Sequence, residues 1–269
     1  MVFWFHTKIE GGKAMRETVY SVPGCPARIA LVTDLHETPF EAVLASLRKH
    51  RPELICVAGD FVFGSLPKTE LKVREAGILP FFSACTALAP CFVSFGNHEW
   101  MLTEADCASL RETGAVLLDD SYTVFNHRGT RLVIGGLTSA RRSACQRLMR
   151  EGLSLEEANE KTRGIQNAVP VLSWLDAYCR EKGYRILLCH HPEYYPRYLK
   201  SRDIPLILSG HAHGGQVRVF GQGLYAPGQG LFPRLTGGVK EQRLVISRGL
   251  ANCQWAPRLF NPTELVYIR

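Results

Sequence analysis

The chain has 269 residues, of which 46% are hydrophobic and 21% charged, so it is long and apolar enough to bury a core. This composition excludes intrinsic disorder and fibrous architectures. The 32 Lys and Arg residues against 25 Asp and Glu give a net charge of +7. That excess favours anionic partners, which include phosphorylated metabolites, nucleic acid and acidic membrane surfaces.

The cysteines and the apolar segments bear on where the protein works. Nine cysteines without a C-x-x-C pair predict reduced, buried thiols and therefore a cytoplasmic protein. The apolar start, 1–5, is too short for a signal peptide or a membrane span. It predicts a first strand or a disordered end, with peripheral membrane contact as the alternative. Residues 76–97 carry no charge, but Pro80 and Pro90 divide them, which predicts a buried helix and strand.

Apolar runs alternate with amphipathic runs through the first half of the chain. The pattern predicts strands at 28–33, 54–58 and 91–95, and helices at 39–50, 68–88 and 103–113. This alternation is typical of an α/β sheet covered by helices.

The second half contains more strands and fewer helices. The pattern predicts strands at 121–126, 131–135, 185–189, 206–209, 216–220, 243–247 and 264–268. Two helices are predicted within 153–179, and residues 221–238, rich in Gly and Pro, are predicted to be irregular. Because no repeat or linker interrupts the chain, we expect a single domain over 1–269 that contains two sheets.

Polar side chains with ligand chemistry follow five of the predicted strands. They are Asp34, His36, Asp60, Asn97, His98, His190, His191, His211 and His213. Loops at the carboxyl ends of strands are where α/β folds place ligands, so these side chains are expected to share one pocket. Each block alone has a plain structural reading, since Asp34 is also suited to capping a helix and Gly59-Asp60 is a common turn.

Carboxylate, amide and imidazole groups together suit Mn, Fe or Zn. Seven or eight such ligands exceed what one ion takes. The set therefore predicts two ions that share a carboxylate, an arrangement used for displacement at phosphorus.

The order of the blocks resembles the calcineurin-like metallophosphoesterase superfamily. The blocks are Asp34-Leu-His36, Gly59-Asp60, Gly96-Asn-His-Glu99, His190-His-Pro192 and Gly210-His-Ala-His213. Further matches are His213-Gly-Gly-Gln216, Gly223-Leu-Tyr-Ala-Pro-Gly228, Ser247-Arg-Gly-Leu250 and Pro262-Thr-Glu-Leu265. These are similar to a branch of small bacterial phosphohydrolases, many of which carry an N-terminal membrane anchor or export signal.

The resemblance implies a fold of two facing mixed β-sheets flanked by helices, with a dinuclear site at one edge. It assigns Asp34, His36 and His213 to the first ion, Asn97, His190 and His211 to the second, and Asp60 to both. It also implies that His98 is a catalytic residue without being a ligand. We expect His98 to act as an imidazolium that donates to the leaving oxygen while a hydroxide bridging the metals attacks phosphorus.

Other features of the sequence bear on how a substrate would bind. Residues 138–167 are rich in basic side chains and predict either a basic helical lid over the site or a solvated helical hairpin. The candidate substrate contacts are Arg141, Arg142, Arg248 and Tyr194.

The sequence thus predicts a dinuclear metal-dependent phosphohydrolase that cleaves a phosphodiester, pyrophosphate or phosphomonoester bond of a small phosphorylated substrate. A metal-dependent nuclease is the alternative, because the chain is basic. It is not favoured, because no stripe of interleaved aromatic and basic residues is present for nucleic acid. A non-catalytic scaffold of the same fold is less favoured still, because every ligand position carries the expected residue type.

Overall fold

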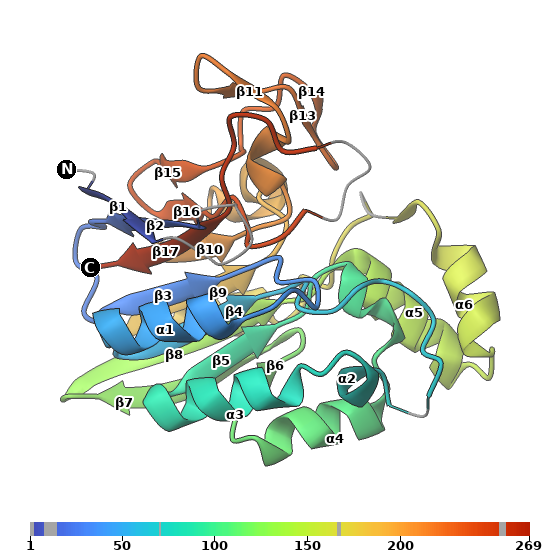
Figure 1. Ribbon diagram of the computed structural model, residues 1–269. Helices are drawn as coiled ribbons and strands as arrows, with labels where there is room; N and C mark the ends of the chain where they lie inside the picture. The colour runs from blue at the N-terminus through green and yellow to red at the C-terminus, as the bar shows by residue number, and fades with distance from the viewer. Residues whose placement is uncertain (1–2, 8–14, 70, 166–167, 253–256) are drawn as a thin grey trace.

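Two mixed β-sheets face each other in the computed structural model, which describes residues 3–7, 15–69, 71–165, 168–252 and 257–269 (Figure 1). The first sheet has seven strands in the order β1-β2-β17-β3-β4-β5-β6 and is parallel from β3 to β6. Its strands are β1 (Phe3–Thr7), β2 (Met15–Tyr20), β17 (Glu264–Ile268), β3 (Ile29–Val32), β4 (Leu54–Ala58), β5 (Cys91–Ser94) and β6 (Val116–Leu118).

The second sheet has six strands in the order β15-β16-β10-β9-β8-β7 and is parallel from β16 to β8. Its strands are β15 (Gly238–Lys240), β16 (Leu244–Ile246), β10 (Leu206–Ser209), β9 (Tyr184–Cys189), β8 (Thr130–Leu137) and β7 (Ser121–His127). Four two-residue strands form two further two-stranded sheets: β11 (Arg218–Val219) with β12 (Gln222–Gly223), and β13 (Tyr225–Ala226) with β14 (Gly230–Leu231).

Helices lie on the outer faces of both sheets. They are α1 (Glu41–His50), α2 (Lys72–Glu75), α3 (Leu79–Leu88), α4 (Glu104–Glu112), α5 (Ala140–Arg150), α6 (Leu155–Thr162) and α7 (Leu175–Arg180). Apolar side chains of α1, α3 and α4 pack on the first sheet, and those of α7 pack on the second. A third apolar cluster, drawn from both sheets, fills the space between them. The predicted fold of two facing mixed sheets flanked by helices is therefore confirmed.

The buried strands explain why the sheets form where the sequence places them. β3 and β4 are buried at every residue, as expected of parallel strands covered on both faces. These strands could be predicted from their continuous apolar runs, because a strand that is buried on both faces need not alternate apolar and polar residues. Strand β2 lacks such a run and β6 has only three residues, and neither was predicted.

Two predicted elements differ from the structure. The helix expected over 68–88 is two helices, α2 and α3, because Gly77 between them adopts a left-handed φ of 62°. The strand expected over 216–220 is reduced to the two residues of β11. The basic segment 138–167 is helical, as α5 and α6, and Figure 1 shows them at one end of the molecule.

The eight cysteines within the described ranges are all free, and six of them are buried. Cys253 lies outside the described residues. Among the described helices, none has both the length and the apolar character that a bilayer crossing needs.

Candidate metal centre

Five loops at the carboxyl ends of β3, β4, β5, β9 and β10 bring the predicted ligands together. All seven are almost completely buried: Asp34, His36, Asp60, Asn97, His190, His211 and His213. Among the described residues, four groups of donor atoms lie close enough together to hold a cation. Two match the predicted division of ligands: Asp34, His36 and His213, and Asp60, His190 and His211. The other two are His36, Asp60 and His98, and His191, Glu193 and His211.

Asp60 lies at the centre of the cluster. Its Oδ2 atom is 2.9 Å from His190 Nε2, 3.9 Å from His36 Nε2 and 3.9 Å from His98 Nε2. Its Oδ1 atom accepts a hydrogen bond from the His98 backbone N–H at 2.8 Å. One carboxylate oxygen therefore faces imidazoles from both sheets, while the other fixes the carboxylate's orientation.

Asp34 is held between two glycines. Its Oδ1 atom is 3.5 Å from His213 Nε2 and accepts the His211 backbone N–H at 3.1 Å. A Cβ atom on Gly210 would lie 2.5 Å from Asp34 Oδ2, and one on Gly249 would lie 2.7 Å from Asp34 Cβ. No other residue fits at either position, so these glycines are required for the buried carboxylate.

The donor atoms fit a metal ion because several have no hydrogen-bond partner. They are both ring nitrogens of His36, Oδ1 of Asn97, and Nε2 of His211. Orphaned buried polar atoms are costly, and a bound cation would satisfy them. Burial also lowers the pKa values of His36 and His213 to about 3. Both rings are therefore neutral at physiological pH, as ligation requires.

His190 differs electrostatically from the other imidazoles. Burial opposes its protonation, but the Asp60 carboxylate outweighs burial and raises the His190 pKa to about 10. Its Nδ1 atom is 2.8 Å from the Ala58 carbonyl, which directs Nε2 towards Asp60. A divalent cation would compete with the proton held between Nε2 and Oδ2.

Glu99 supports the centre, a role that the sequence analysis missed. Each of its carboxylate oxygens accepts two backbone N–H bonds, from Asp60, Phe61, Val62 and Gly96, at 2.7–3.2 Å. Burial and the Asp60 charge raise the Glu99 pKa to about 7. Four accepted bonds nevertheless require the ionised form. The sequence feature that could have identified Glu99 is its place in the Gly96-Asn-His-Glu99 block.

His98 is 22% exposed at its side chain and faces Asp60 from the solvent side. Its Nδ1 atom accepts the Gly64 backbone N–H at 2.9 Å. An accepting nitrogen carries no proton, so the proton of this ring is on Nε2. Nε2–H is thus the donor that His98 presents beside Asp60, and the catalytic role of His98 stays a prediction.

His191 and Glu193 form an adjoining cluster that was also missed. Both ring nitrogens of His191 are engaged, by Glu193 Oε1 at 3.0 Å and Ser139 Oγ at 2.9 Å. Of the two neighbouring histidines, His190 is thus the one that faces Asp60. Glu193 Oε1 is 3.7 Å from His211 Nε2, while Glu193 Oε2 is buried without a partner.

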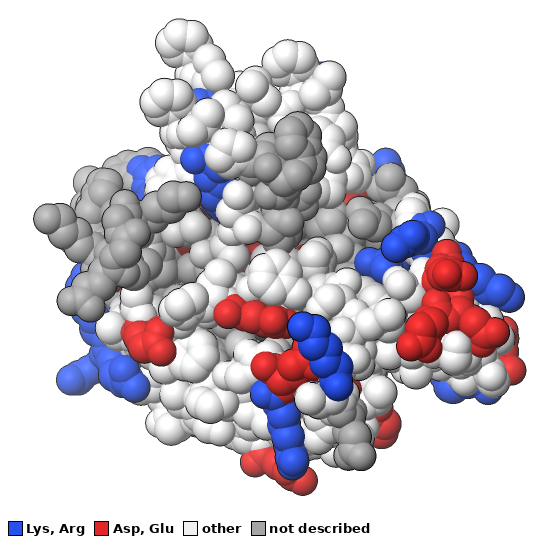
Figure 2. Space-filling model, turned by 45° about the vertical axis from the view of Figure 1, so that its right-hand side comes forward, with Lys and Arg blue, Asp and Glu red and all other residues white. Residues whose placement is uncertain are grey.

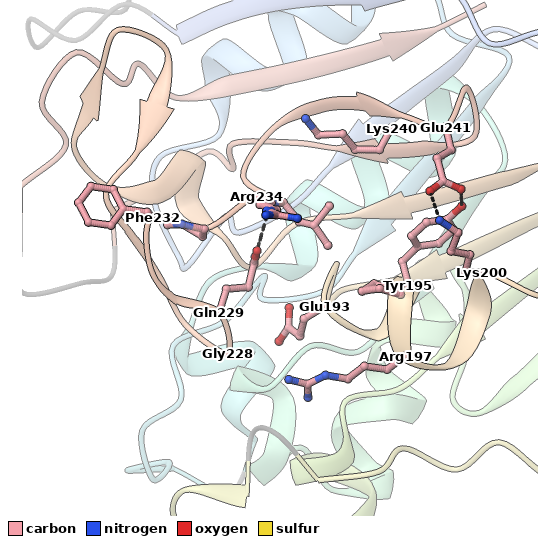
Figure 3. Close-up of a pocket in the computed structure, with 13 residues that line it drawn as sticks. Glu193, Tyr195, Arg197, Lys200, Gly228, Gln229, Phe232, Arg234, Lys240 and Glu241 are labelled. Atoms are coloured by element: carbon pink, nitrogen blue, oxygen red, sulfur yellow. Dashed lines mark hydrogen bonds and ion pairs between the residues drawn. The ribbon is translucent and has the colours of Figure 1, made fainter.

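A cavity of about 760 Å³ begins at Glu193 (Figure 3). Three of its lining residues are basic and face the same space: Arg197, Arg234 and Lys240. A fourth cation, Lys200, is engaged by Glu241 at 2.6 Å. With Lys200 and Glu241 paired to each other, the remaining charged residues that line the cavity are these three cations and Glu193.

Two of the predicted substrate contacts are wrong because the side chains are buried. The Arg142 guanidinium donates to the backbone carbonyls of Glu99 and Leu102 and to Asp119, so it braces the fold. Tyr194 is fully buried and stacks on His191 with a ring distance of 4.8 Å.

The other two lie elsewhere. Arg141 is partly buried on α5, over the Trp100 ring at 4.9 Å, and donates to Asn159 on α6. The Arg248 side chain lines a second cavity with Arg16 and Arg218, although the next residue, Gly249, packs against Asp34.

Several known proteins are similar to this chain. An uncharacterized protein, YpbG, from Bacillus subtilis is 24% identical over 87% of this chain and 77% of its own length. A bovine transmembrane protein with a metallophosphoesterase domain is 25% identical over 71% of this chain, which spans only 41% of that protein. The solved structure of Haemophilus influenzae NAD nucleotidase covers 69% of this chain and 38% of its own, at 17% identity and a TM-score of 0.43. The model of the calcineurin-like phosphoesterase family matches residues 27–215, and the chain belongs to that family.

Proposed function

We propose that this protein is a dinuclear phosphohydrolase that cleaves a phosphodiester, pyrophosphate or phosphomonoester bond with two Mn, Fe or Zn ions. The observation that carries the proposal is the position of Asp60. Its Oδ2 atom faces imidazoles from both sheets, so one carboxylate is available to two neighbouring donor groups. Pairs of ions that share a ligand clamp the attacking and leaving oxygens in displacement at phosphorus.

The proposal divides the predicted ligands between the two ions. Asp34, His36 and His213, which form one donor group, would hold one ion, and His190 and His211 would hold the other. Asn97, whose Oδ1 atom has no hydrogen-bond partner, would join the second ion, and Asp60 would hold both. When bound, such ions lower the pKa of water and neutralise charge on phosphoryl oxygens.

The chain itself supplies the rest of the chemistry. His98 presents Nε2–H at the solvent side of Asp60, where it would donate a hydrogen bond to a phosphoryl or leaving oxygen. Arg141, on the α5–α6 hairpin, is the remaining candidate for contact with the substrate from a lid. The cavity lined by Arg197, Arg234 and Lys240 suits an anionic part of the substrate remote from the reacting phosphorus.

The test is hydrolysis of bis-p-nitrophenyl phosphate and p-nitrophenyl phosphate by metal-stripped protein, with Mn, Zn and Fe added back separately. Activity should return with metal, and the ratio of diester to monoester rates defines the class of bond. The Asp60→Asn variant is the control, because it keeps the shape of the side chain and removes its charge. Wild-type protein that takes up no metal and shows no activity would overturn the proposal.

A further inference from the structure

One end of the molecule carries exposed phenylalanines on tight turns. Phe220 lies in the turn between β11 and β12 and is fully exposed, and Phe260 is 87% exposed. Both adopt left-handed φ angles, of 48° and 53°. Glycine or asparagine is favoured at such positions, and a phenylalanine there adds strain without burying its ring. Folding of the chain by itself therefore gives no reason for either ring.

The two turns are joined to each other. Val217 pairs with Leu259 in an isolated bridge, and the Arg218 N–H donates to the Leu259 carbonyl at 3.0 Å. Phe220 and Phe260 line the same cavity, of about 580 Å³. The rings therefore form one exposed apolar patch rather than two scattered side chains.

Three guanidinium groups line that cavity between the rings: Arg16, Arg218 and Arg248. The buried carboxylate of Glu264 lies nearby, with its Oε2 atom 4.0 Å from Arg248 Nε. Burial and then the charge of Arg248 lower the pKa of Arg16 to about 10. The pKa of Arg218 is lowered by the same two causes. The cations thus repel one another, and an anion between them would relieve that repulsion.

The surrounding chain is depleted of acidic residues. Residues 204–263 contain six basic side chains and a single acidic one, Glu241. The end of the molecule that carries β11, β13 and β14 is mostly uncharged, with basic side chains among the white surface (Figures 1 and 2). Exposed aromatic rings beside cations are the combination that binds the interface of an anionic membrane.

We propose that this arginine–phenylalanine face, formed by Arg16, Arg218, Arg248, Val219, Phe220 and Phe260, docks on an anionic phospholipid surface. The phosphate of a lipid headgroup occupies the arginine-lined cavity, and the two rings enter the interface beside it. Adventitious binding of free phosphate is the competing use of the same cavity, and the test separates the two.

Docking in this way places the metal centre at the membrane. β16 and β10 are parallel, so Arg248, which follows β16, and His211, which follows β10, lie at the same edge of the sheet. Arg218 Nη1 also donates to the Gly214 carbonyl, next to His213, at 2.6 Å. A lipid-linked phosphate ester would thus reach the ligand cluster without leaving the interface.

The test is cosedimentation of the full chain with vesicles of phosphatidylglycerol and phosphatidylcholine, compared with phosphatidylcholine alone. We expect binding to anionic vesicles at low ionic strength that weakens as salt is added. The assay measures binding and not catalysis, so its result does not depend on whether the protein has the proposed hydrolase activity.

Variants assign the binding to the face. Phe220→Ser with Phe260→Ser should weaken binding by more than about tenfold, because both rings leave the interface. Leu88→Ser, a half-exposed apolar residue at the opposite end of the strands, should not change it. Arg16→Gln should weaken anionic binding roughly fivefold, whereas Arg128→Gln, exposed elsewhere, should not. Melting temperature and p-nitrophenyl phosphate hydrolysis report whether each variant is folded.

Four outcomes would overturn the proposal. The first is no cosedimentation at low ionic strength, and the second is binding that neither the two Phe substitutions nor Arg16→Gln weakens. The third concerns chemical modification of the Arg16 and Arg248 side chains by an arginine-specific reagent. If inorganic phosphate protects them from the reagent and anionic vesicles do not, the cavity binds a free anion. Concentration-dependent dimerisation that is abolished by the two Phe substitutions, without vesicle binding, would assign the face to a second copy instead.

Discussion

The loops that follow the two sheets contribute to one donor cluster but are held in different ways. In the first sheet, the Asp60 and Gly96 loops are fixed by a side chain, because the Glu99 carboxylate accepts four backbone N–H bonds. In the second sheet, imidazoles are oriented by backbone carbonyls. His190 Nδ1 lies 2.8 Å from Ala58 O, and His213 Nδ1 lies 3.3 Å from Ala251 O.

The difference follows from the chemistry of the ligands. A loop that points a carboxylate inward leaves amide N–H groups buried beneath it, and an anion is the strongest acceptor for them. An imidazole instead needs one acceptor for its second nitrogen, which any strand-end carbonyl provides. The first sheet's half of the centre should therefore depend on a single side chain, and the second sheet's half on the backbone.

The largest effect is expected where the two halves meet. Asp60→Asn removes the charge that faces imidazoles from both sheets, so both ions should be lost. We expect hydrolysis to fall by more than about 1,000-fold, beyond the loss of a single charge-stabilising group. Elemental analysis of the purified variant measures the metal content, and two retained ions would show that the halves bind independently.

His98→Gln should separate ligand positioning from proton donation. The side chain accepts the Gly64 N–H and is not assigned to either ion. We expect both ions to remain bound while hydrolysis falls by roughly 100-fold, the low end for loss of a positioned proton donor. Loss of metal in this variant would make His98 a ligand and would overturn the division of roles.

Glu99→Gln tests the comparison directly. The amide nitrogen of Gln cannot accept, so two buried N–H groups beneath the Asp60 and Gly96 loops lose their partner. We expect the free energy of unfolding to fall by about 2–4 kcal/mol and metal affinity by about 10–100-fold. Chemical denaturation and metal titration measure the two quantities.

Glu193→Gln is the matched control for Glu99→Gln, because Glu193 lies beside the second sheet's ligands and Gln still accepts from His191. Its effect on metal affinity should be several-fold smaller. Equal effects of the two substitutions would show that both halves depend on a carboxylate.

Asp120 lies where the chain crosses from β6 of one sheet to β7 of the other, and it should affect stability alone. Burial raises its pKa from 3.8 to about 7. Because the folded pKa is the higher one, the unfolded chain loses this proton first, and stability falls as pH rises from about 4 through 7. Asp120→Asn should remove that dependence, worth roughly 1–2 kcal/mol after solvent screening. Thermal melting between these pH values measures it.

The fold and the ligand positions could be predicted because short stretches of the sequence are enough to indicate both. Buried parallel strands such as β3 and β4 appear as continuous apolar runs, and a ligand follows directly at the end of each. The metal roles of these residues remain predictions that the geometry supports.

What could not be predicted depends on distant contacts. β2 has a mixed burial pattern and is defined by pairing with β17, at the other end of the chain. Arg142 and Tyr194 have residue types common in binding sites, and only the tertiary structure shows them bonded inside. Glu99 and Glu193 carry no periodic signal, since their partners are backbone groups or rings on other loops.

The backbone of the centre also bears on how the sequence can change over time. Five of the seven predicted ligands, Asp34, His36, Asp60, His211 and His213, have φ angles between 44° and 65°. Each such residue costs about 1 kcal/mol that glycine would not. Selection for thermal stability alone would therefore favour glycine at these positions and would erase a donor at each step. A screen that retains only better-melting variants is expected to drift away from metal binding unless metal is present during selection.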